Sequence, residues 1–112
     1  MHDHQPQLPL RLPVNPGYCE LCHREDVLLT KHHAIPKSLH NKAYVRKHIS
    51  KEEKITHVLW LCRPCHDCIH KILGEKQIMQ SYRTVDALMT VPEIASFVSW
   101  IKTKPAGFKP KK

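Results

Sequence analysis

Residues 61–70 read LCRPCHDCIH, and this stretch decides how the chain folds. Cys62 and Cys65 lie on either side of a short turn, so both sulfurs can face one metal ion. His66 and His70 follow, four residues apart on a stretch that the sequence predicts to be a helix. Residues with this spacing point the same way, about one turn apart, as in a two-histidine metal clamp. Because His66 is next to Cys65, a metal at the cysteines would fix the start of the helix that carries both histidines.

A second cysteine pair, Cys19 and Cys22, has the same Cys-x-x-Cys spacing as the first. Four thiolates at about 2.3 Å form the closed tetrahedral shell of a structural Zn²⁺. The chain has five cysteines, and an odd number argues against a complete disulfide framework. The two pairs therefore predict one structural zinc, with a redox dithiol or unliganded thiols as the alternatives. Cys68 is either a buried spare thiol or an alternative zinc ligand.

The pattern of apolar and β-forming residues predicts the order strand, loop, strand, helix. The two strands cover residues 27–30 and 57–61, and the segment 34–51 between them is irregular or weakly helical. The helix covers residues 65–73 and stops at Gly74. This order predicts a small α+β module.

A further helix near the C-terminus has a clear start signal. Thr90 is placed to cap it, Pro92 lies in its first turn and Glu93 can reach back to the cap. Apolar residues then recur at helical spacing, at Ile94, Phe97, Val98 and Ile101. The pattern predicts a helix that supports the module by packing.

The chain divides into four parts. Residues 1–16 are a proline-rich, extended arm, and residues 17–73 are the functional module, with all five cysteines and eight of the ten histidines. Residues 74–104 are helical support, and residues 105–112 are a basic, frayed tail.

The composition points to an anionic partner and a small core. A formal net charge of +8 favours nucleic acid as the partner, the alternative being a basic protein with no such partner. With two Phe, two Trp and three Tyr, the core is thin enough to need a metal staple. No apolar run approaches a membrane span, and residues 1–16 lack the apolar stretch of a signal peptide. We therefore expect a cytosolic protein with reduced cysteines and no membrane partner.

His32 and His33 follow the first predicted strand. Neighbouring residues on an extended chain point to opposite sides, so the two histidines have different tasks if both are functional. One can bind a metal while the other faces a substrate water. The alternative is a pair of solvent-exposed histidines in a basic loop.

Together these motifs resemble the zinc-knuckle branch of the HNH endonucleases. The similarity covers residues 17–73 and rests on three strings: YCELC at 18–22, HHAIPKS at 32–38 and LCRPCHDCIH at 61–70. The resemblance implies the ββα-metal fold, also called the His-Me finger, which agrees with the predicted strand, loop, strand, helix order. It also implies a metal-dependent enzyme that hydrolyses the phosphodiester bonds of DNA.

The resemblance assigns a role to each histidine. His33 matches the general base that activates water, and His32, His66 and His70 match the ligands of a catalytic divalent metal. His57 falls where the family usually has Asn, the residue that orients the catalytic loop through hydrogen bonds, and Asn41 is a second candidate for that role.

The chemistry of the residues fits this activity independently. A neutral histidine can act as the base, and a cation can offset the charge that develops on the phosphate. The candidate metals are Zn²⁺, Ni²⁺, Co²⁺, Mn²⁺ and Mg²⁺, although Mg²⁺ prefers oxygen ligands to histidine.

A run of basic residues between His33 and Glu52 contains no acidic residue and predicts contacts with the phosphate backbone, of DNA first and RNA as the alternative. The predicted contact residues are Lys37, Lys42, Arg46, Lys47 and Lys51. A merely solvated basic face is the simpler interpretation of this run.

Two other functions compete with the nuclease. One is a catalytically inactive, zinc-dependent nucleic-acid-binding module, and the other is a zinc module that binds proteins. A pure binder needs only the four cysteines, so the four histidines at 32, 33, 66 and 70 argue against the first. The basic excess argues against the second.

Overall fold

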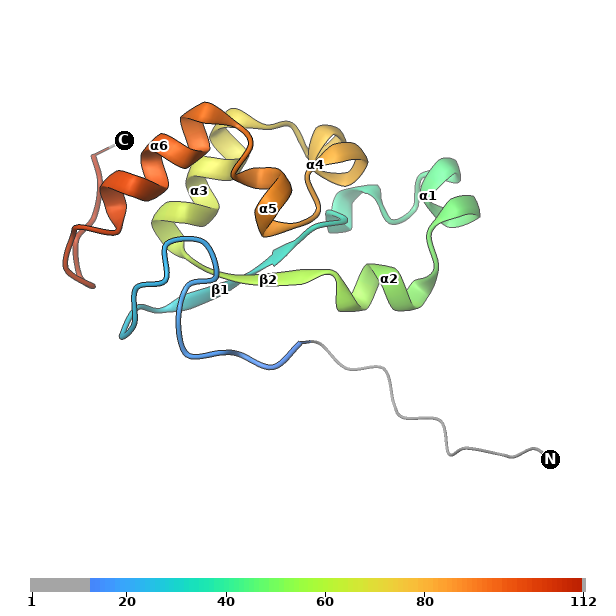
Figure 1. The fold of residues 1–112 in the computed structure, drawn as a ribbon. Coiled ribbons are helices and arrows are strands. Elements are labelled where there is room, and N and C mark those ends of the chain that lie inside the picture. The colour runs from blue at the N-terminus through green and yellow to red at the C-terminus, as the bar shows by residue number, and fades with distance from the viewer. Residues whose placement is uncertain (1–12, 112) are drawn as a thin grey trace.

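The computed structural model describes residues 13–111, which form a two-stranded antiparallel sheet surrounded by helices. The predicted order of strand, loop, strand and helix is present (Figure 1). The elements are β1 (Leu29–His33), η1 (Lys37–Leu39), α1 (Ala43–His48), α2 (Lys51–Thr56), β2 (Val58–Cys62), α3 (Arg63–Ile72), α4 (Glu75–Ser81), α5 (Val85–Leu88) and α6 (Pro92–Ile101).

The first strand lies later in the sequence than expected. β1 starts at Leu29 rather than at residue 27, and it includes both His32 and His33 instead of ending before them. Its extent is set by pairing with β2, in which His32 lies opposite Leu59 and His33 opposite Val58. The two histidines therefore sit on a regular, paired strand, which alternates their side chains between its two faces.

Helix α3 follows β2 without an intervening loop. Pro64 lies in its first turn, where the missing backbone N–H costs nothing. Ile69 is fully buried in the main core, and Figure 1 shows α3 and α6 side by side over the sheet. The helix ends at Ile72 as the sequence predicts to within one residue, but Gly74 does not stop it. Gly74 instead precedes α4 as its N-cap, with an ordinary negative φ.

The segment between the two strands is partly helical. It contains η1 and two short helices, α1 and α2, which Figure 1 shows at one end of the molecule. A second, small core holds it together, formed by Ile35, Val45, Ile49 and Met79. Of the two alternatives expected for residues 34–51, irregular or weakly helical, the short helices η1 and α1 and the start of α2 agree with the second.

The C-terminal region is helical as predicted, but its cap differs. Val91 is the N-cap of α6, and its side chain has no acceptor with which to cap the helix. The Thr90 hydroxyl lies one residue earlier and donates to the carbonyl of Ala87 at 2.6 Å. Within residues 13–111 no helix combines the length and the apolar character needed to traverse a membrane.

The structure describes most of the C-terminal tail but little of the N-terminal arm. Most of the predicted proline-rich arm, residues 1–12, lies outside the described residues, as does residue 112. The predicted frayed tail is packed in part: the Phe108 ring lies against the main core, 5.5 Å from the ring of Trp100. The tail is held because Phe108 contributes an apolar ring to a core that contains few others.

The cap of α2 gives a test of the fold. Ser50 accepts a hydrogen bond from the backbone N–H of Glu53, and the Glu53 carboxylate accepts one from the N–H of Ser50, both at 3.0 Å. Loss of such a cap costs about 1 kcal/mol. We expect Ser50→Ala to lower the free energy of unfolding in urea by about that amount. Ser99→Ala, at an exposed position inside α6, is the control and should change it by less than about 0.5 kcal/mol.

Candidate metal centres

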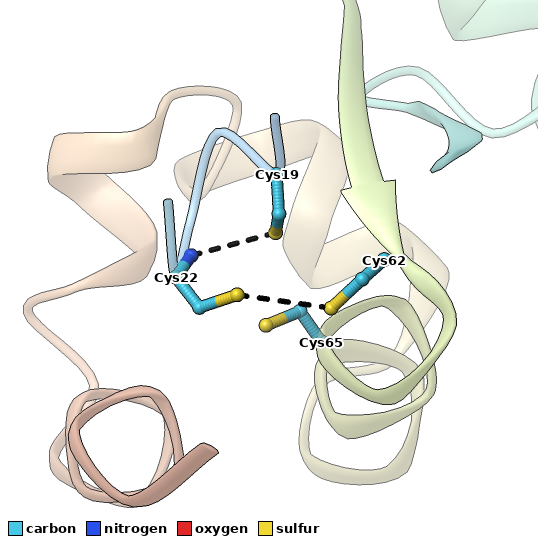
Figure 2. Close-up of side chains that lie close together, drawn as sticks. All are labelled: Cys19, Cys22, Cys62 and Cys65. Atoms are coloured by element: carbon cyan, nitrogen blue, oxygen red, sulfur yellow. Dashed lines mark hydrogen bonds between the residues drawn. The ribbon is translucent and has the colours of Figure 1, made fainter. Parts of the chain in front are cut away.

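Four cysteines from separate parts of the chain converge in the core. Cys19 and Cys22 come from the loop before β1, Cys62 ends β2 and Cys65 lies on α3. Figure 2 shows all four sulfurs directed toward a common centre. The four sulfur atoms all lie within 4.8 Å of one another, and all four residues are buried.

The spacing and the protonation of these sulfurs fit a metal. The sulfurs of Cys22 and Cys62 are 3.8 Å apart. A tetrahedral ion with bonds of about 2.3 Å requires about 3.8 Å between its sulfurs. Hydrogen bonds from Cys19 and Cys65 lower the pKa of Cys62, whereas hydrogen bonds with Cys19 and Cys62, together with burial, raise the pKa of Cys65. The pKa values of these two thiols are thus shifted in opposite directions. A divalent cation would favour the thiolate form of both, so the cluster is compatible with a structural zinc.

The loop that carries the first pair is shaped by its own backbone. The N–H of Cys22 donates to the sulfur of Cys19 at 3.4 Å, and the N–H of His23 donates to the carbonyl of Cys19 at 2.7 Å. His23 has a φ of +66°, a left-handed conformation that His tolerates better than most residues. Glu20 then attaches the loop to β2. Its N–H donates to the carbonyl of Trp60 at 2.9 Å, and its carboxylate accepts from the Trp60 N–H at 2.7 Å.

Arg24 places a buried positive charge beside the sulfurs, a contact that the sequence analysis did not predict. Its guanidinium donates to the sulfur of Cys22 at 3.4 Å and to that of Cys62 at 3.3 Å. A third N–H donates to the carbonyl of Pro105 at 3.0 Å. Four thiolates around one Zn²⁺ carry a net charge of −2, so with zinc bound Arg24 would offset half of it in a place shielded from water.

Cys68 lies outside the four-cysteine cluster. Its side chain is 8% exposed and packs in the main core, and burial raises the pKa of its thiol to about 11. It is therefore a buried spare thiol, the first of the two alternatives that the sequence left open.

A second group consists of three histidines. His32 lies on β1, and His66 and His70 lie on α3. Their ring centroids are 5.0 to 5.3 Å apart, and one ring nitrogen from each lies within 4.8 Å of the others. The structure thus brings together the three residues predicted to hold a catalytic metal, as a group that could bind one.

His32 is the most unusual member of this group. Its side chain is fully buried, and neither ring nitrogen has a hydrogen-bond partner in residues 13–111. Burial, followed by the nearby charges of His66, His70 and His33, lowers the pKa of His32 to about 3. Burial and His70 likewise lower the pKa of His66 to about 4. Both rings are therefore neutral at pH 7 and keep a lone pair for a cation.

His33 occupies the other face of β1. It is partly buried, and burial together with the charges of Lys37, His40 and Lys31 lowers its pKa. Its charge contributes to the lowered pKa of His32 and of His66, and His33 is not a member of the three-histidine group.

His57 lies outside both groups, at the end of α2. Its carbonyl accepts a hydrogen bond from the N–H of Ala34 at 2.9 Å, which fixes the backbone just after His33. Its buried ring nitrogen Nδ1 has no partner within residues 13–111. At this position the hydrogen bond to the backbone after His33 comes from the main chain, and the role of the His57 side chain stays a prediction. Asn41, the other candidate for that role, is exposed.

The five predicted phosphate-contacting residues lie along η1, α1 and the start of α2. All are exposed, and none forms an ion pair with a carboxylate in the part of the chain described. The same surface carries Tyr44, 60% exposed, whose ring lies 4.6 Å from that of His48.

The chain is similar in sequence to a known bacterial protein. The uncharacterized protein YisB of Bacillus subtilis (strain 168) is 36% identical over 91 residues, which cover 80% of this chain and 77% of YisB. The chain belongs to the YisB family. No family model matches the sequence, and no solved structure matches it. Because YisB is uncharacterized, membership of its family assigns no activity, and any function must come from the two sites.

The four-cysteine cluster can be tested by removing one ligand. We expect one tightly held zinc per chain, measured by metal analysis, and we expect Cys62→Ser to lose it and to unfold most of the module. A structural zinc contributes roughly 10 kcal/mol or more in small zinc peptides, which is comparable to the whole free energy of unfolding of a small domain. Cys68→Ser is the matched control and should keep both zinc and fold. A folded, zinc-free protein recovered after chelation would contradict the prediction.

Proposed function

We propose that this protein is a metal-dependent endonuclease of the HNH kind, which hydrolyses phosphodiester bonds of DNA. One observation carries the proposal: His32 is fully buried, neutral and without a hydrogen-bond partner within residues 13–111, and it faces His66 and His70. Leaving buried polar atoms unpaired costs about 1–3 kcal/mol, so such atoms call for a ligand. Imidazole nitrogens from three histidines are suited to a divalent cation.

The arrangement of β1, β2 and α3 supports a ββα-metal interpretation of the fold. The two strands are antiparallel, and α3 follows β2 directly and packs against the sheet. A structural zinc held by Cys62 and Cys65 would join the end of β2 to the start of α3. It would thereby hold the helix that carries His66 and His70 at a fixed angle to the strand that carries His32.

A cation held by the three histidines would offset the negative charge that develops on the phosphate and on the leaving oxygen. Three protein ligands leave positions open for phosphate oxygens. Histidine nitrogens favour Zn²⁺, Ni²⁺, Co²⁺ or Mn²⁺ over Mg²⁺.

We assign the general base to His33. Its ring is neutral at pH 7, because burial and the surrounding cations lower its pKa, and it directly follows His32 on β1. A neutral ring nitrogen can accept the proton of the attacking water while the water oxygen bonds to phosphorus and the leaving oxygen departs. The same lowered pKa makes His33⁺ release this proton readily afterwards.

The proposed substrate contact is the basic surface of η1, α1 and α2. Its exposed lysines and arginine are free of carboxylate partners in residues 13–111 and can neutralise phosphates, which supplies affinity without sequence preference. We propose DNA as the substrate and the cytosol as the compartment, since thiolates stay reduced there.

The roles of His32 and His33 can be separated by metal titration of plasmid nicking. We expect His33→Ala to lose about 10²–10⁴-fold in rate at every metal concentration, because added metal cannot replace a base. His32→Ala should lose metal affinity and recover part of its rate as metal is added. Ser99→Ala, at an exposed position on α6 outside both the histidine group and the basic surface, should cut normally.

Other outcomes would point elsewhere. Recovery of His33→Ala but not of His32→Ala would reverse the two roles. A wild-type protein that binds DNA and metal but does not cut would favour the catalytically inactive nucleic-acid-binding module.

The pH dependence gives an independent test of the base. Because the pKa of His33 is lowered from 6.5, its neutral form persists to more acidic pH than in a free histidine. The cleavage rate should therefore rise with pH and reach half its maximum below pH 6.5, and a bound cation would move the midpoint in the same direction. A midpoint clearly above 6.5, measured at saturating metal, would contradict His33 as the base.

A further inference from the structure

The hydroxyl of Thr30 lies between two groups that fix its orientation. Its oxygen is 2.8 Å from the carbonyl oxygen of Leu61, the residue opposite it on β2, and 2.7 Å from Nδ1 of His66. Thr30 and His32 are two residues apart on β1, so both side chains project from the same face of the strand, toward α3. One strand therefore brings both a histidine of the group and a polar contact to another histidine of that group.

Counting protons decides the direction of each hydrogen bond. A carbonyl oxygen can only accept, and a hydroxyl has one proton to give. Thr30 therefore donates to Leu61, and its oxygen can only accept from His66. The proton of the neutral His66 ring then sits on Nδ1, which leaves the lone pair on Nε2.

We propose that Thr30 is the positioning residue of the three-histidine centre. It holds the His66 ring in the tautomer and orientation that present Nε2 to a divalent cation. The inference rests on the metal centre of the proposed function, although it does not require that the centre cut DNA.

The support from Thr30 is local to His66. The branched side chain of threonine has few χ1 rotamers, and its hydroxyl is tied to the sheet through Leu61, so it is a stiff partner. His32 has no comparable support in residues 13–111, since both of its ring nitrogens are unpaired there. Loss of an outer hydrogen bond to a metal-binding histidine typically lowers metal affinity 10- to 100-fold.

Two variants separate the hydroxyl from the shape of the side chain. Thr30→Val keeps the branched shape and removes the hydroxyl, whereas Thr30→Ser keeps the hydroxyl. Each protein is prepared with one zinc in the four-cysteine cluster, checked by metal analysis and circular dichroism, and then titrated calorimetrically with Zn²⁺. We expect Thr30→Val to bind the second zinc about 10- to 100-fold more weakly and Thr30→Ser to bind it nearly as well as the wild type.

The tautomer itself can be read without any variant or any cleavage. In the wild-type protein before the second zinc is added, ¹⁵N chemical shifts of the His66 ring should show a protonated Nδ1 and an unprotonated Nε2. A protonated Nε2 would overturn the proposal, as would equal second-zinc affinity in wild type and a folded Thr30→Val. A wild type that binds the second zinc but does not cut DNA would contradict the nuclease alone, and a wild type that takes up no second zinc would contradict both.

Discussion

The convergence of four cysteine sulfurs within 4.8 Å is the constraint on which the rest of this structure depends. Three segments meet there: the loop around Cys19 and Cys22, the end of β2 and the start of α3. Because β2 runs into α3 with no loop, fixing Cys62 and Cys65 also fixes the angle between strand and helix. The sulfurs are members of the main core, in a chain with two Phe and two Trp. A metal at this point would replace part of the hydrophobic burial that so small a core cannot supply.

The same geometry assembles the histidines. His66 directly follows Cys65 on α3, and His32 lies on the strand that pairs with β2. The two centres thus share one scaffold. All four cysteines are buried, whereas the histidine group runs from the buried His32 to the exposed His70.

Features set by residues close together in the sequence could be predicted, whereas features set by contacts between distant segments could not. The cysteine cluster and the shared face of His66 and His70 follow from local spacing and the period of a helix, and both are present. The extent of β1 was misjudged because pairing with β2, rather than local propensity, carries it through His33. Helix α2 was missed although Ser50 and Glu53 form a capping pattern that is readable in the sequence. Thr90 was misassigned because α5 ends just before it and offers a nearer carbonyl. The roles of the histidines in catalysis stay predictions.

Arg24 illustrates what spacing alone does not reveal, because its partners Cys62 and Pro105 lie 38 and 81 residues further along the chain. Beyond Pro105, Phe108 packs on Trp100, and the Lys104 ammonium lies 5.2 Å from the Trp100 ring and 5.3 Å from the Phe108 ring. The segment around Pro105 is thus linked to the cysteine cluster through the Arg24 guanidinium, which also donates to two of the sulfurs. A truncation before residue 105 would therefore remove one of the three acceptors of Arg24. Shortening this end of the protein would thus loosen the guanidinium that contacts the sulfurs of Cys22 and Cys62.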